Sequence, residues 1–363
     1  MSQTGIPFFF MRGGTSRGPY FNRADLPEDR ETLAQVLIAA IGAGHPLNID
    51  GIGGGAAVTT KVAMLSKSRE NWADIDYFFA QVSVEEKLVD FKPTCGNILA
   101  GVGPAALEMG LIEPGADQTE IRIRAVNTGA RVIAKFATPE GQVEYQGTAH
   151  IDGVPGTAAP IELAFMDVAG SSTGALLPTG SLIDVIDGIP VTCMDVAMPI
   201  VIARASDFGK TGDETREELD GDAAYMERME QVRRAAAERM GMGDVSKSVT
   251  PKFALVAAPR AGGTLATRYF MPWNCHPTMA VTGGQCLATC ALTSGTVADG
   301  LAARPQEVPA RVVLEHPSGQ MDVIVDYGPA DPGLDVKSAG ILRTARKLAE
   351  GSVFVPSTVL AAD

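Results

Sequence analysis

Two short glycine-containing motifs carry the residues whose chemistry is most evident. Thr94-Cys95-Gly96-Asn97 contains a thiol, and Val281-Thr282-Gly283-Gly284 has a hydroxyl at the matching place. Each motif opens an apolar stretch that is typical of a buried helix. Glycine permits a close approach of the backbone, and the first N–H groups of a helix point at whatever lies before them. We therefore expect both motifs to bind carboxylates, and the first motif alone to supply a reactive cysteine.

Cys95 is predicted to be a reactive thiol. The residues from Ile98 to Met109 are apolar nearly all round, which predicts a helix buried on every side. A thiol at the start of such a helix lies near the positive end of the helix dipole, which lowers a thiol pKa. Pro104 is expected to kink this helix, because proline removes a hydrogen bond. The alternative is a buried structural cysteine.

A second candidate side chain is Lys61. It follows the glycine-rich run Asp50–Gly55 and Thr60, and it precedes the apolar run Val62–Leu65. The glycines lack the spacing of a nucleotide-binding loop, so nucleotide binding is only weakly supported. The pattern predicts a strand that carries Lys61 into a cleft, where a low dielectric would allow it to lose its proton and act as a base. The alternative is an ordinary surface lysine.

A third motif, Met11-Arg12-Gly13-Gly14-Thr15-Ser16-Arg17-Gly18, reads as a glycine-rich turn that carries hydroxyl and guanidinium groups. Arg12 and Arg17 are suited to bidentate binding of carboxylates, and Thr15 and Ser16 add hydrogen-bond donors. The alternative is a solvated turn.

The elements around these motifs predict a duplicated α/β chain. Residues 119–124 alternate polar and apolar side chains, as a half-buried strand does. The tetrapeptides at 139–142 and 317–320 have the form Pro-x-Gly-Gln and predict a hairpin turn in each half. The flanking strands are predicted at residues 131–138 and 143–146 in the first half, and at 311–315 and 321–325 in the second.

The length of 363 residues predicts two domains, because single cores rarely grow to that size. The glycine-rich residues 170–180 place the expected boundary near residue 180. We expect domains at 1–180 and 181–346, with residues 347–363 returning to the first. Residues 214–240 predict an amphipathic surface helix whose apolar side chains face a core, namely Met226, Met229, Val232, Ala236 and Met240.

Composition narrows the classes of partner. The net charge is −13 and the isoelectric point is about 4.8, without a basic patch, which argues against nucleic-acid and anionic-membrane partners. The sequence contains no signal peptide, and no apolar run approaches the ~20 residues of a membrane span. We therefore expect a cytoplasmic protein with a small-molecule substrate. This expectation is compatible with a homo-oligomer.

The five cysteines are an odd number without an export signal, so we expect thiols instead of disulfides. Cys275, Cys286 and Cys290 lie near His276 but lack the spacing of paired metal ligands. They are predicted to be small buried hydrophobic residues. We expect neither a metal nor a cofactor.

Taken in order, five motifs resemble the PrpF family along nearly the whole chain. The motifs are M-R-G-G-T-S-R-G, D-G-I-G-G followed by T-K, C-G-N-I-L-A-G-V-G-P, A-L-L-P-T-G and E-H-P-S-G. The family contains 2-methylaconitate cis-trans isomerases and 4-oxalomesaconate tautomerases, and the motifs look closest to the second branch. The resemblance implies two similar diaminopimelate-epimerase-like domains, each a sheet wrapped around a central helix, with the active site in the cleft between them.

The resemblance also implies proton transfer without a cofactor, with Lys61 and Cys95 as the catalytic residues. Epimerases of this fold use two cysteines, whereas the second motif here has Thr282, which argues against racemisation. It favours moving a proton along an allylic system of an unsaturated tricarboxylate, most simply 4-oxalomesaconate from aromatic-acid degradation. The residues expected to bind the substrate are Arg12, Thr15, Ser16, Arg17, Thr60, Gly96, Asn97, His276, Thr282, Gly283 and Gly284. His316 is expected at a hairpin turn.

Two alternatives remain open at this stage. An isomerase of 2-methylaconitate or a related aconitate would use the same residues. A non-catalytic protein that stabilises a partner enzyme would keep the fold without the chemistry, although such a protein would need neither Lys61 nor Cys95.

Overall fold

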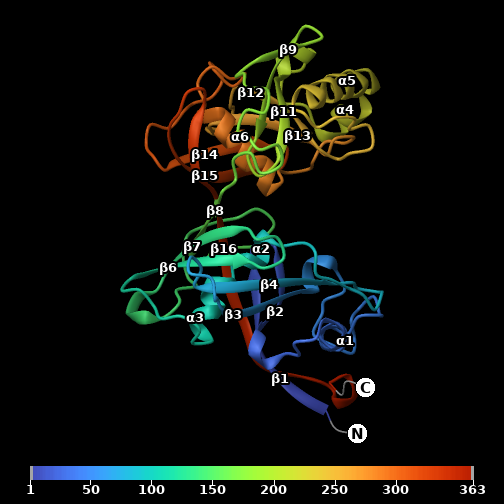
Figure 1. Ribbon diagram of the computed structural model, residues 1–363, viewed down its shortest axis with the longest axis vertical. Helices are drawn as coiled ribbons and strands as arrows, with labels where there is room; N and C mark the ends of the chain where they lie inside the picture. The colour runs from blue at the N-terminus through green and yellow to red at the C-terminus, as the bar shows by residue number, and fades with distance from the viewer. Residues whose placement is uncertain (1–2, 361–363) are drawn as a thin grey trace. The chain divides into compact units, whose positions relative to one another are not determined.

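The computed structural model describes residues 3–360, and these form two compact units (Figure 1). Unit 1 holds the described residues up to Leu163 and those from Leu342 onward, and unit 2 is Ala164–Ile341. The chain passes from one unit to the other within two strands, β8 (Pro160–Met166) and β16 (Leu334–Pro356).

The unit boundary differs from the one expected near residue 180, and the return to unit 1 begins at residue 342 instead of 347. The glycine-rich segment belongs to unit 2, where the buried carboxylate of Asp195 accepts hydrogen bonds from it. The backbone N–H groups of Ser172 and Thr173 donate to this carboxylate at 2.8 and 2.7 Å. The glycines therefore belong to an anchored turn, and the crossing is made by extended chain instead.

Unit 1 is a sheet wrapped around two short helices. Its strand order is β1-β2-β3-β4-β6-β7-β8, β16 follows β8, and β16 also pairs with β1, so the order closes on itself. Inside lie α2 (Gly96–Leu99) and α3 (Val102–Glu108), most of whose apolar side chains are buried. On the outer face α1 (Arg30–Ile41) packs against the sheet. The strands are β1 (Gln3–Gly13), β2 (Ser16–Asn22), β3 (Lys61–Lys67), β4 (Ile75–Val82), β5 (Val89–Asp90), β6 (Gln118–Ala125) and β7 (Arg131–Ala137).

Unit 2 has the same plan, with α6 (Val281–Leu292) as its central helix. Its strand order is β16-β15-β14-β13-β12-β11-β10-β9. A second core forms where α5 (Ala223–Arg239) packs on the sheet, next to α4 (Arg216–Gly221) (Figure 1). The strands are β9 (Asp184–Ile186), β10 (Ile189–Asp195), β11 (Pro199–Arg204), β12 (Lys252–Ala257), β13 (Leu265–Phe270), β14 (Ala310–His316) and β15 (Gly319–Pro329). Single-turn 3₁₀ helices lie at Arg23–Asp25, Ala57–Thr59, Pro139–Gly141, Ala205–Phe208 and Ser357–Val359.

The strand pairings confirm two similar domains. In unit 1 the pairs β1/β2, β2/β3, β3/β4, β4/β6 and β6/β7 alternate antiparallel and parallel. In unit 2 the pairs β10/β11, β11/β12, β12/β13, β13/β14 and β14/β15 alternate in the same order. A helical connection spans each parallel step, so both central helices follow the fourth strand of their repeat.

The predicted helices exist, but two of them are broken. The helix expected from Ile98 to Met109 stops at Leu99 and restarts at Val102, which places Pro104 in a first turn, where its missing N–H costs little. The helix expected over 214–240 is interrupted at Asp222, whose side chain accepts a hydrogen bond from Tyr225 N at 3.0 Å and caps α5. Its apolar side chains face the core as expected.

One predicted hairpin is present and the other is not. Strands β14 and β15 pair across the turn at 317–318, with His316 opposite Gly319, as expected for His316. At 139–142 the chain forms a 3₁₀ turn, and residues 143–146 are not a strand. They run past the end of α3 instead, where the Tyr145 hydroxyl donates to Glu108 at 2.6 Å.

Candidate active site

The β1–β2 hairpin brings two of the predicted motifs together. Its turn holds Gly14 and Thr15, and the Thr15 hydroxyl accepts a hydrogen bond of 3.1 Å from the Asn97 side-chain amide at the start of α2. A Cβ atom on Gly14 would lie 2.1 Å from Asn97 Oδ1, and Gly14 has a φ of +48°. Because only glycine tolerates both conditions, the sequence Gly-Gly-Thr allows this turn to contact α2.

Lys61 lies beside this hairpin, as the first residue of β3. A Cβ atom on Gly18 would lie 1.7 Å from the Lys61 carbonyl oxygen, so a glycine is required where β2 passes the lysine. The strand predicted to begin at Lys61 is confirmed. The lysine Nζ donates a 2.7 Å hydrogen bond to Gln81 Oε1 and lies 5.4 Å from the ring centroid of Phe79.

One face of β4 contacts both predicted catalytic residues. Tyr77, Phe79 and Gln81 occupy alternate positions, so their side chains point to the same side of the sheet. The Tyr77 hydroxyl donates to the Cys95 carbonyl oxygen at 3.3 Å, while the other two side chains contact Lys61. Sequence reasoning missed these three residues. The one sequence feature that could have indicated them is Gln81, a polar residue near the end of an otherwise apolar strand.

Cys95 is the N-cap residue of α2 and is partly exposed. The expected support from a long helix dipole is not present, because α2 has only 4 residues. What remains is the set of first N–H groups that every helix leaves without an intrahelical acceptor.

Two tyrosines next to Cys95 are held in their neutral form. Tyr20 and Tyr77 are fully buried, and burial, reinforced by the nearby Cys95, raises the pKa of each phenol well above its ordinary value. The Tyr20 hydroxyl donates to the Ile98 carbonyl oxygen. Both phenols thus act as hydrogen-bond donors to backbone carbonyl oxygens at the start of α2.

The other four cysteines are buried, as predicted for Cys275, Cys286 and Cys290. Burial raises the pKa of Cys275 and Cys290 to about 11, that of Cys193 to about 12, and that of Cys286 as well. Within residues 3–360, no three or more His, Cys, Asp or Glu side chains gather in a geometry that could hold a metal ion.

Alkylation should therefore single out Cys95. With iodoacetamide at pH 7.5, we expect Cys95 to react first, because the other thiols are both shielded and protonated. Peptide mass spectrometry over time measures the five rates separately. Equal rates at all five cysteines would contradict the distinct environment of Cys95.

The two arginines of the hairpin lie on the other face of the sheet from Lys61. Tyr20 of β2 pairs with Ala63 of β3, so Tyr20 shares the face of Ala63 and of Lys61, two residues away. Its hydroxyl reaches α2 on that face. Arg17 is an odd number of residues from Tyr20 and lies on the opposite face, together with Arg12, its partner on β1. Ser16 alternates with Arg17 and so shares the face of Lys61, where it is buried. The register therefore separates Ser16 from the arginines within one motif.

Each arginine has a defined setting. Arg12 Nη1 donates to the carbonyl oxygens of Gly14 and Thr344 and to the Thr344 hydroxyl, at 2.9 to 3.0 Å. Burial, and then the charge of Arg346, lowers the pKa of Arg12. Arg17 lies 5.8 Å from the Phe10 ring centroid, and a Cβ atom on Gly54 would be 2.8 Å from its Nη2. Arg17 thus lies against the glycine-rich run, and a substrate-binding role for both arginines stays a prediction.

The side chain of Thr60, the residue before Lys61, is linked to the lysine side chain through Gln81. Its side chain is fully buried, and its hydroxyl donates to Val82 O at 2.7 Å and accepts from Gln81 Nε2 at 3.1 Å. Its side chain is thus hydrogen-bonded within the protein, and the substrate contact expected from the sequence stays a prediction.

In unit 2, the second motif opens α6 as predicted. Ala280 is the N-cap and Thr282 is the second helical residue, partly exposed. Gly283 and Gly284 are buried, and Cβ atoms there would lie 2.5 Å from the Tyr269 ring and 2.8 Å from the Met321 sulfur. These glycines allow α6 to pack closely on its sheet.

His276 precedes α6 and is expected to be neutral. Its Nδ1 accepts a 3.0 Å hydrogen bond from Thr278 N, and its ring meets that of Tyr269 edge-on at 6.0 Å. Burial lowers the pKa of His276, and the charges of Arg216 and Lys252 lower it further. A substrate-binding role for His276 stays a prediction.

Replacing Thr282 tests whether the second motif binds substrate. We expect Thr282→Ala to weaken substrate binding by about 1–3 kcal/mol, the cost of leaving a polar group unpaired. The measurement is KM together with the inhibition constant of an unreactive tricarboxylate. An unchanged KM and inhibition constant would remove Thr282 from the substrate site.

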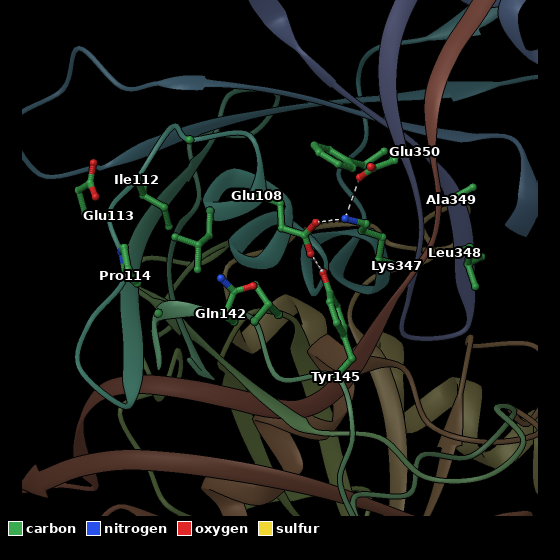
Figure 2. Close-up of a pocket in the computed structure, with 15 residues that line it drawn as sticks. Glu108, Ile112, Glu113, Pro114, Gln142, Tyr145, Lys347, Leu348, Ala349 and Glu350 are labelled. Carbon is green, nitrogen blue, oxygen red and sulfur yellow. Dashed lines mark hydrogen bonds and ion pairs between the residues drawn. The ribbon is translucent and has the colours of Figure 1, made fainter. Parts of the chain in front are cut away.

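A hollow of about 850 Å³ in unit 1 is lined by the C-terminal end of α3 and by residues that follow it (Figure 2). Lys347 is paired with Glu108 and lies 2.8 Å from Glu350, and Tyr145 donates to Glu108 at 2.6 Å. Figure 2 shows these four side chains joined in a row, from Tyr145 through Glu108 and Lys347 to Glu350. Burial, and then the hydrogen bond to Glu108, raises the pKa of Tyr145. These four polar groups therefore satisfy one another, and Glu113, the other carboxylate of the lining, is exposed.

No helix within residues 3–360 is both long and apolar enough to cross a membrane.

The chain is similar to proteins of one family along nearly its whole length. The family model described as PrpF protein matches residues 3–356. The chain is 46% identical to a 4-oxalomesaconate tautomerase of Pseudomonas putida, over 98% of this chain and 97% of the relative. It is also 46% identical to a (4E)-oxalomesaconate Delta-isomerase of Novosphingobium sp., over 96% of this chain and 97% of the relative. The crystal structure of a methylitaconate-delta-isomerase superposes with a TM-score of 0.92 at 33% identity, covering 100% of this chain and 98% of that one.

Proposed function

This chain belongs to the PrpF family and is an isomerase, and we propose that it moves a proton along the allylic system of 4-oxalomesaconate. The observation that carries the chemistry is the β4 face that contacts both Lys61 and Cys95. The side chains of one strand, β4, thus contact both the residue with the amine and the residue with the partly exposed thiol, and the neighbouring tyrosines are neutral. The relatives named for 4-oxalomesaconate support the choice of substrate.

In the proposed reaction, neutral Lys61 removes an acidified proton from the carbon next to the carbonyl and the alkene. The C–H bond breaks, its electron pair delocalises into a dienolate, and the lysine becomes an ammonium. A proton then returns at the far end of the conjugated system, from Lys61 or from Cys95 as the acid. When Cys95 is the donor, proton transfer from the ammonium to the thiolate restores both groups, so the cycle needs no oxidant and no cofactor.

The carboxylates and the developing enolate need hydrogen-bond donors. Thr15, Ser16 and Asn97 lie where the hairpin meets α2, and the first N–H groups of α2 point out of the same helix end. These groups support a role of the hairpin–helix contact in binding the dienolate. The cytoplasmic location is part of the proposal and is supported by five free cysteines.

Proton NMR in deuterated water tests the substrate and the chemistry together. With 4-oxalomesaconate and the protein, we expect deuterium to enter at one allylic carbon as the isomer forms. A second candidate is methylitaconate, favoured by the TM-score of 0.92 to its isomerase, and it is assayed in parallel. Turnover of methylitaconate but not of 4-oxalomesaconate would overturn the proposed substrate, and isomerisation without deuterium entry would overturn the mechanism.

A further inference from the structure

The side-chain amide of Gln81 is held in one orientation. The two N–H groups of its Nε2 are shared among four oxygens: Ala57 O at 3.1 Å, Thr60 Oγ1 at 3.1 Å, Val82 O at 3.2 Å and Thr60 O at 3.5 Å. Turning the amide over would place its oxygen against three carbonyl oxygens. The surrounding backbone therefore fixes Oε1 toward Lys61 Nζ, which donates to it at 2.7 Å.

The acceptor presented to Lys61 is neutral. Within residues 3–360, Lys61 forms no ion pair with a carboxylate. Besides Gln81, its Nζ lies near the Phe79 ring, which is also uncharged. A carboxylate at hydrogen-bond distance would favour the ammonium form, whereas an amide fixes the nitrogen without adding charge. An amine that must accept a proton from carbon benefits from that difference.

The corresponding lysine of unit 2 lacks this arrangement. Lys252 is the first residue of β12, as Lys61 is of β3, and the pairing of Phe253 with Phe270 places Lys252 opposite Met271. Its Nζ donates to the backbone oxygen of Met271 at 3.3 Å. The repeat therefore supplies a lysine in both units, but a side-chain amide acceptor only beside Lys61.

We propose that Gln81 is a positioning residue. Held by Thr60 and Ala57, it fixes Lys61 Nζ at the reacting carbon and gives this amine an acceptor that carries no charge. This inference rests on Lys61 being the base of the proposed function. Gln81 itself does not touch the substrate, so its effect is expected in turnover more than in binding.

Two substitutions at Gln81 separate position from charge. Gln81→Met keeps the length but removes the acceptor, and we expect kcat to fall by ~10–100-fold with KM changed little, because the nitrogen is no longer fixed. Gln81→Glu keeps the shape but adds a charge, and we expect the rising limb of the pH–rate profile to move up by about one pH unit or more, with activity recovered at high pH. Gln35→Met, on the exposed face of α1, is the matched control and should behave as wild type.

A second readout does not depend on any substrate. The rate at which Lys61 reacts with acetic anhydride, followed by peptide mass spectrometry against pH, reports the neutral amine directly. We expect the reaction of Lys61 in Gln81→Glu to require a higher pH, while Lys67 in the same protein is unaffected. Folding of each variant is checked by its thermal unfolding midpoint.

The outcomes distinguish this inference from the proposed function. An inactive Lys61→Met together with a Gln81→Met kcat within twofold of wild type would overturn the role of Gln81 alone. An unshifted acylation profile in Gln81→Glu would overturn it as well. An active Lys61→Met would overturn both the base and its positioning residue. If the wild type does not convert 4-oxalomesaconate, the proposed substrate fails while the acylation profile still decides the role of Gln81.

Discussion

Replacing Lys61 with methionine is expected to lower turnover by ~10²–10⁴-fold or more while leaving substrate binding largely unchanged. Methionine has nearly the length of lysine and can still pack on the Phe79 ring, so the change removes the amine and little else. The measurement is kcat and KM for 4-oxalomesaconate across pH 6 to 9.

Lys67→Met is the matched control, because Lys67 is exposed at the opposite end of the same strand and should have no effect on turnover. A near-normal rate in Lys61→Met would place the base elsewhere, with Cys95 as the next residue to test.

Replacing Cys95 with serine is expected to lower turnover strongly, by about 10²-fold or more, with a smaller change in KM. A serine hydroxyl is a far poorer acid than a thiol and cannot supply a stabilised anion at neutral pH. The fold should tolerate this change, since Cys95 is the N-cap of α2 and serine is among the best residues at that position. An unchanged thermal unfolding midpoint verifies that turnover was lost without loss of the fold.

Solvent exchange in Cys95→Ser identifies the roles of the two residues. If substrate protons still exchange with deuterated water while net isomerisation stops, Lys61 is the base and Cys95 the acid. Full isomerisation in this variant would leave Lys61 as the sole proton carrier and reduce Cys95 to an electrostatic role. Loss of both exchange and isomerisation would assign the first proton transfer to Cys95.

Local features of the site were predictable because their causes are local. The strand that begins at Lys61 follows from an apolar run after a polar loop, and the buried helix α6 follows from apolar residues behind Val281. Cys286 and Cys290 are buried because they lie within that apolar helix. The duplication was indicated by two similar glycine motifs and is confirmed by the two series of strand pairings.

Features that depend on pairing between distant segments could not be predicted. The 12-residue helix expected after Cys95 is broken between Leu99 and Val102, where a Cβ atom on Gly101 would lie 2.4 Å from the Tyr20 hydroxyl. The boundary expected near residue 180 is wrong, because Asp195, downstream of the glycines, accepts hydrogen bonds from the glycine-rich turn and holds it in unit 2. In both cases a contact from another strand overrides the local pattern.

The sequence by itself determined the chemistry available to this protein: an amine at Lys61, a thiol at Cys95, and glycines that let the backbone approach them. Tertiary structure alone decided the surroundings of these groups. Strand register placed Arg12 and Arg17 on the face away from Lys61. It also placed Tyr77, Phe79 and Gln81 on the face that contacts Lys61 and Cys95. The physical reason is that a side chain's type is set by one position, whereas its face and neighbours are set by hydrogen bonds between strands far apart in the chain.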